Sequence, residues 1–130
     1  GMDQVEFHTG IEDPAEFVGR LLGKAYRQGA RVLVTADDAL QERIGRHLWA
    51  SNERDFIAHV RLARCTAAQA ARTPLWLAAA VQALPHAAGL QRLERLIEVV
   101  CAAPEQAAAG RQRWRQYKAA GLHIKHFAAT

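Results

Sequence analysis

Residues 4–35 read QVEFHTGIEDPAEFVGRLLGKAYRQGARVLVT, and this stretch decides the fold. It opens at Gln4 to His8, where polar and apolar residues alternate as they do in a short strand. It closes at Arg31 to Thr35, a β-branched run typical of a strand that is buried on both faces. Because a helical pattern separates the two, the stretch predicts an α/β unit with parallel pairing of its strands.

The helix between these two strands has clear signals at both ends. Asp13 can cap its first turn, Pro14 suits the first helical position, and Glu16 stands three residues after the cap. Gly29 follows the last apolar residue of the helical pattern, as a C-terminal glycine does. We therefore expect one helix between Asp13 and Gly29.

The rest of the chain continues to alternate between helices and strands. Asp37 and Asp38 are suited to open a second helix, and Pro104 suits the first turn of a last helix that ends near Gly121. Apolar runs predict four further strands, at Thr73 to Leu77, around Ala79 to Ala83, at Leu93 to Val100 and, as a closing edge strand, at His123 to Phe127.

Length and composition fit one soluble globular domain. The chain has 130 residues, of which 50% are hydrophobic and 23% are charged. Its apolar runs are far shorter than the roughly 20 residues that a membrane helix needs. The sequence shows no secretory signal, so we expect a cytoplasmic protein with no membrane partner.

The basic charge of the chain is concentrated near one end of the sequence. The formal net charge is +4, and Glu105 is the last acidic residue. Such a localised basic surface implies a localised anionic partner. Five basic residues follow Glu105 with no acidic residue among them: Arg111, Arg113, Arg115, Lys118 and Lys125.

The sequence lacks the usual signatures of catalysis and of cofactor binding. The loop after the first strand, Thr9 to Asp13, has no GxGxxG pattern, and the chain has neither a Walker A sequence nor a GxSxG elbow. His123 and His126 are three residues apart, which puts them on opposite faces of a strand and argues against a metal site. Glu94 and Glu98 are expected on an exposed face. We expect no cofactor, no metal and no enzymatic activity.

The last predicted helix carries the strongest candidate site. Its residues at positions i, i+3, i+4 and i+7 share one face, which combines three cations with one large aromatic side chain. Arginine pairs with carboxylates in a bidentate way and the indole offers apolar area, so the face suits an acidic, hydrophobic peptide that ends in a free carboxylate. These residues are Arg111, Trp114, Arg115 and Lys118.

Two other interpretations of this helix stay open from the residues alone. In the first, Trp114 and Tyr117 are core residues and the arginines are a solvated face. In the second, the helix binds single-stranded nucleic acid weakly, with arginines on phosphates and Trp114 stacked on a base. The second interpretation is less favoured because the rest of the domain supplies no continuing basic groove.

Several stretches, in order along nearly the whole chain, resemble one known family. They are VEFHT, LLGKAYRQGARVLVT, ALQERIGRHLW, DFIAHV, TPLWLA, ERLIEVV and GRQRWRQYKAAGLHIKHF. Together they are similar to the DNA polymerase III chi subunit family, small accessory proteins of the bacterial clamp-loader complex. The resemblance implies one domain over residues 2–130 with three α/β/α layers around a mixed, mostly parallel sheet. It further implies a Rossmann-like fold without a nucleotide site and without catalytic activity.

The resemblance also implies a first partner, the acidic and hydrophobic C-terminal tail of single-stranded DNA-binding protein. The tail-binding pattern of the family, an arginine, an aromatic residue and two basic residues, falls here on Arg111, Trp114, Arg115 and Lys118. An apolar wall is expected from the end of the ERLIEVV strand. Val100 and Ala103 are the candidates for this wall.

A second implied partner is the psi subunit, which links chi to the clamp loader. The contact surface of the family corresponds here to Trp49 and Phe56. From the residues alone, both could equally be ordinary core aromatics, whereas an exposed pair would mark an interface. With these two partners, the protein would contact DNA only indirectly.

Overall fold

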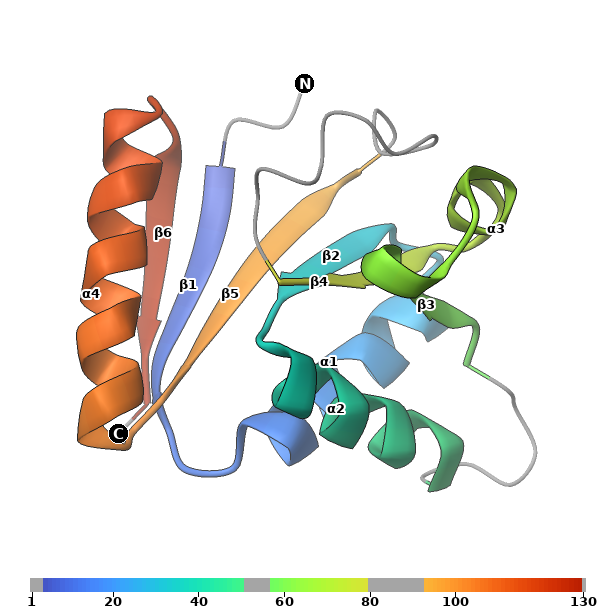
Figure 1. The fold of residues 1–130 in the computed structure, drawn as a ribbon, viewed down its shortest axis with the longest axis horizontal. Coiled ribbons are helices and arrows are strands. Elements are labelled where there is room, and N and C mark those ends of the chain that lie inside the picture. Colours follow the sequence, from blue (N-terminus) through green and yellow to red (C-terminus); the bar gives the residue numbers. More distant parts are fainter. Residues whose placement is uncertain (1–3, 51–56, 80–92, 130) are drawn as a thin grey trace.

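The computed structural model describes residues 4–50, 57–79 and 93–129 (Figure 1). These residues form a six-stranded sheet with four α-helices and one short 3-10 helix. The strands are β1 (Gln4–Ile11), β2 (Val32–Thr35), β3 (His59–Arg61), β4 (Leu75–Ala78), β5 (Arg95–Cys101) and β6 (His123–Ala128). The helices are α1 (Pro14–Arg27), α2 (Asp38–Ala50), the 3-10 helix η1 (Leu62–Arg64), α3 (Ala67–Arg72) and α4 (Pro104–Ala119).

The sheet has the strand order β3-β4-β2-β5-β1-β6, and every pairing between described strands is parallel. The expected α/β class is confirmed, but in the described part the sheet is wholly parallel instead of mixed. The reason lies in the connections, since α1 joins β1 to β2 and α4 joins β5 to β6. A helical crossover returns the chain in its original direction, so the two strands that it joins run parallel although another strand lies between them in the sheet.

A hydrophobic core lies on each face of the sheet, which confirms the three-layer architecture. On one face, α1 and α2 contribute Leu22 and Ile44 to a core with β2, β4 and β5. On the other face, α3 and α4 contribute Ala70 and Tyr117 to a core that contains Trp76 of β4. In Figure 1, α4 stands beside β6 and β1 at one end of the sheet, away from α1 and α2.

Most predicted elements are confirmed to within a few residues. The capping prediction for α1 is also correct, because the Asp13 side chain accepts a hydrogen bond from the Glu16 N–H at 3.2 Å and Gly29 has a φ of +73°. The strand predicted around Ala79 to Ala83 falls almost entirely outside the described residues.

Two short elements, β3 and α3, were not predicted. Strand β3 has only three residues and no alternating pattern long enough to read. Helix α3 does have a readable signal, because Thr66 and Gln69 form a reciprocal capping box. The Thr66 hydroxyl accepts from the Gln69 N–H at 3.1 Å, and the Gln69 side chain accepts from the Thr66 N–H at 2.8 Å.

An ion pair joins β1 to β5 on the face opposite α4. The Arg95 guanidinium donates to both carboxylate oxygens of Glu6, at 2.7 and 2.8 Å. Only 14% of the Glu6 side chain is exposed. These hydrogen bonds hold the pKa of Glu6 below its ordinary value of 4.5, against the opposing effect of burial.

Replacement of Glu6 by glutamine is expected to lower the free energy of unfolding at neutral pH by about 1 kcal/mol. The expected loss is small for a charged pair because Arg95 is partly exposed and solvent screens its charge. The folded-state pKa lies below the unfolded-state pKa, so the stabilisation is complete above pH 4.5 and is lost as the pH falls through the folded value. Denaturant unfolding of both proteins between pH 7 and pH 3 tests this, and the two curves should converge at the acid end. A constant difference down to pH 3 would contradict it, while Glu16→Gln on exposed α1 serves as the control.

Candidate functional site

Helix α4 packs unusually close to the sheet at Gly110. A Cβ atom at this position would lie 2.7 Å from Cγ1 and 2.8 Å from Cγ2 of Val100 on β5. Real Cβ atoms do not approach other carbons so closely, so the glycine is what permits this packing distance. The contact brings the middle of α4 down onto the end of β5, next to β1.

A buried polar cluster holds α4 to the same strand. Glu98 of β5 is only 2% exposed. Its Oε1 accepts a hydrogen bond from the Tyr117 hydroxyl at 2.8 Å and forms an ion pair with Arg113, whose Nε lies 2.8 Å away. Burial raises the pKa of Glu98, while Arg113 and Tyr117 act against this rise. Burial and the nearby Glu98 carboxylate also raise the pKa of Tyr117. The expectation that Glu98 lies on an exposed face is therefore wrong, because it faces α4.

Trp114 lies half-buried on the neighbouring face of α4. The centroid of its ring lies 5.0 Å from that of the Phe7 ring, with an angle of 72° between the ring planes. The His126 ring lies at a centroid distance of 5.1 Å and an angle of 85°. These T-shaped contacts fix the indole between α4, β1 and β6. The core interpretation is thus correct for Tyr117, which is buried, and only partly correct for Trp114.

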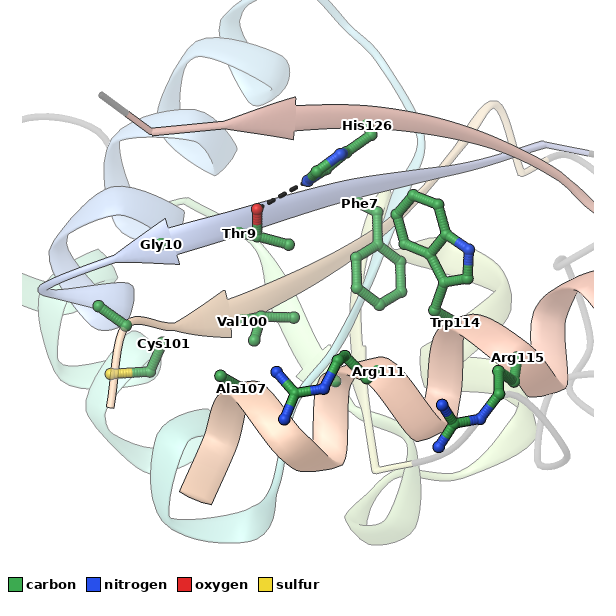
Figure 2. Close-up of a pocket in the computed structure, with 12 residues that line it drawn as sticks. Phe7, Thr9, Gly10, Val100, Cys101, Ala107, Arg111, Trp114, Arg115 and His126 are labelled. Carbon is green, nitrogen blue, oxygen red and sulfur yellow. Dashed lines mark hydrogen bonds between the residues drawn. The ribbon is translucent and has the colours of Figure 1, made fainter. Parts of the chain in front are cut away.

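A hollow of about 510 Å³ opens between α4 and the strands β1, β5 and β6. Figure 2 shows Trp114 pointing from the helix toward Phe7, with Arg111 and Arg115 on the same stretch of α4. We call this hollow the α4 groove. It is lined by Phe7, Thr9, Gly10, Val100, Cys101, Ala102, Ala107, Gly110, Arg111, Trp114, Arg115 and His126.

The α4 groove contains four of the six residues predicted for a peptide site, namely Arg111, Trp114, Arg115 and Val100. The other two lie outside its lining. Lys118 is exposed one turn beyond Trp114 along α4, and Ala103 is exposed at the N-cap of the same helix. Within the described residues, neither Arg111 nor Arg115 forms an ion pair, so both guanidiniums are available to an anion.

The wall opposite the two arginines comes from residues that the sequence did not indicate. Phe7 and Thr9 of β1 face the groove together with His126 of β6. The Thr9 hydroxyl and His126 Nε2 are 2.7 Å apart and form a hydrogen bond that joins the two strands (Figure 2). The alternation of polar and apolar residues predicts that β1 and β6 are strands, but the sequence does not show that they pair and share one wall of the groove.

A second hollow of about 440 Å³ lies at the carboxyl ends of β2 and β5. Doubly wound proteins often bind nucleotides at this place, where successive connections leave on opposite faces. Here, however, four acidic residues line the hollow and its one basic residue, Arg113, already pairs with a carboxylate of the lining. Asp37 caps α2 by accepting from the Leu40 N–H at 2.8 Å. The acidic lining residues are Asp37, Asp38, Glu98 and Glu105. A phosphate would meet these negative charges at the position where it needs donors.

Of the two residues expected at a psi interface, the structure describes only Trp49. Trp49 lies near the end of α2 and is 69% exposed, so it is not a core aromatic. Phe56 lies outside the described residues. The exposed indole is separated from the α4 groove by the sheet, because α2 and α4 cover opposite faces.

Fold and site together define an α/β domain whose last helix carries a basic, apolar groove. The family model described as DNA polymerase III chi subunit, HolC, matches residues 2–125, so the chain belongs to this family. The resemblance found in the sequence is thereby confirmed. A comparison with curated proteins gives no match.

Family membership supports the role of an accessory subunit in DNA replication as part of DNA polymerase III. Among the described helices, none combines the length and the apolar character needed to cross a membrane. The described residues also contain no group of three or more histidine, cysteine or acidic side chains that could hold a metal ion.

Proposed function

We propose that the protein is a non-catalytic subunit of the bacterial clamp-loader complex that binds the acidic C-terminal tail of single-stranded DNA-binding protein. The α4 groove is the proposed binding site. One observation supports it most: two guanidiniums without ion pairs in the described chain border an apolar hollow. Its size suits one large side chain of a peptide together with a carboxylate group.

The groove offers complementary contacts to such a tail. The terminal carboxylate would pair with Arg111 or Arg115 in a charge-assisted way. The last apolar side chain would enter the hollow against Val100, Ala107 and Trp114. Acidic residues further back in the tail would lie near Lys118, which continues the basic face of α4 beyond the groove.

The same proposal includes a link to the rest of the complex through the psi subunit. Tryptophan is enriched at protein interfaces relative to the rest of the surface, and Trp49 exposes 69% of its surface. Because Trp49 and the α4 groove lie on different layers of the domain, one subunit could hold both partners at once.

Direct binding of single-stranded nucleic acid is the competing function, and the geometry around Trp114 weighs against it. Base stacking needs an open aromatic face, whereas Trp114 is half-buried and already contacts the rings of Phe7 and His126. A titration of the protein alone with a single-stranded oligonucleotide separates the two functions. Retardation with a steep salt dependence would favour nucleic-acid binding over the proposed peptide site.

Removal of the peptide's terminal charge is expected to weaken binding. Two acidic peptides of identical sequence, one ending in a free phenylalanine carboxylate and the other in the amide, are titrated against the protein. The amide should bind about tenfold more weakly, because a charge-assisted hydrogen bond to arginine is lost. Isothermal titration calorimetry gives both dissociation constants, and equal affinities would exclude recognition of the free carboxylate.

A further inference from the structure

Helix α4 has little apolar surface with which to attach itself to the sheet. Only two of its residues, Gly110 and Tyr117, are buried. The α4 groove opens along one side of the helix, and the 440 Å³ hollow at Gln106, Ala109 and Arg113 opens along the other. With a hollow on each side, the packing that restrains the rotation of α4 about its axis rests on few contacts, chiefly those of Gly110, Trp114 and Tyr117.

The cluster around Glu98 adds a polar and directional restraint. Arg113 and Tyr117 are four residues apart and therefore share one helix face. Both reach the same carboxylate oxygen at 2.8 Å, Arg113 as an ion pair and Tyr117 as a hydrogen-bond donor. Glu98 itself belongs to β5, between β2 and β1, so its position is fixed by the sheet. Hydrogen bonds to a buried charge are stronger and more directional than apolar contacts.

We infer that Glu98 is a positioning residue for the α4 groove, which sets the orientation of Arg111, Trp114 and Arg115 without touching the bound peptide. This inference rests on the proposed function. Arg111 and Arg115 flank Arg113 on the helix, so a rotation that releases Arg113 also moves both guanidiniums relative to His126 and Phe7. The three arginines of the basic run thus have different roles. Arg113 pairs with Glu98, whereas Arg111 and Arg115 line the α4 groove, where the peptide would bind.

The variant Glu98→Gln distinguishes positioning from simple electrostatics by the sign of its effect. The substitution removes one negative charge near the groove, and charge alone would tighten the binding of an acidic peptide. Loss of the anchor should instead weaken binding about three- to tenfold. The titration is run at pH 8, because burial raises the pKa of Glu98. Unchanged or tighter binding would overturn the inference.

A second variant tests the anchor without any change of charge. Tyr117→Phe keeps the buried ring and removes only the hydroxyl that donates to Glu98. It is expected to weaken binding about threefold, whereas Tyr26→Phe, a matched change on α1, should leave the affinity unaltered. An affinity equal to wild type for Tyr117→Phe would count against the role of Glu98.

Amide hydrogen exchange supplies a readout that does not depend on the peptide. In Glu98→Gln, the amides of α4 should exchange faster, while those of α2 on the opposite face keep their wild-type rates. If the wild-type protein binds no acidic peptide, the proposed function fails, and the exchange rates still decide whether Glu98 holds the helix. Equal acceleration in α2 and α4 would mean general destabilisation and would reject a specific positioning role.

Discussion

The substitution Arg115→Glu is expected to weaken binding of the acidic tail peptide about a hundredfold. Arg115 borders the α4 groove and has no acidic partner in the described chain, so its guanidinium is free to pair with a carboxylate. The substitution removes this charge-assisted contact and puts a negative charge next to a negative ligand. Fluorescence or calorimetric titration at low salt measures the loss.

Salt and a matched variant test whether the loss is local. The difference between Arg115→Glu and wild type should shrink as ionic strength rises, because Arg115 is exposed and its charge is screened. The control is Arg20→Glu on α1, which changes the net charge equally at a site that is 74% exposed and away from the groove. Equal affinity of Arg115→Glu and wild type would remove Arg115 from the site.

The variant Gly110→Leu is expected to destabilise the protein by about 3 kcal/mol. Even the first added carbon would lie 2.7 Å from Val100 Cγ1, and a valine side chain in a strand has little freedom to move away. The helix would have to leave the sheet, and the gain of about 1 kcal/mol in helix propensity offsets only part of the cost. Urea unfolding followed by circular dichroism measures the change.

An exposed position on the same helix provides the control for this steric argument. Ala108→Leu adds a similar side chain where α4 faces solvent, and it should change stability by less than about 0.5 kcal/mol. Similar stabilities for the two variants would contradict the close contact between Gly110 and Val100. Because the groove lies beside this contact, Gly110→Leu should also reduce peptide affinity at temperatures where it remains folded.

The sequence predicted much of the fold because its signals are local. Asp13, Pro14 and Gly29 mark the two ends of α1, and the short, β-branched run at Arg31 to Thr35 favours a strand, as observed for β2. The wholly parallel pairing of the described strands was not predicted. It depends on which strands become neighbours, and that choice is made by packing between elements far apart in sequence.

The sequence predicted the residues that α4 contributes to the candidate site, but not those that β1 and β6 contribute. Helical spacing brought Arg111, Trp114 and Arg115 to one face without any knowledge of the fold. It could not assign Arg113, whose place in the basic run looked equivalent until Glu98 proved to be buried beneath it. The local sequence places His126 on an edge strand and argues against a metal site there, but it gives no sign of the hydrogen bond to Thr9.

The position of β1 between β5 and β6 has a consequence for how the protein is made. Strand β1 leaves the ribosome before both of its neighbours, so its edges stay unpaired while the chain up to β5 and β6 emerges. Such distant pairings slow folding and expose strand edges to other chains. The α4 groove, built from β1, β5, α4 and β6, is therefore complete only after β6 has emerged.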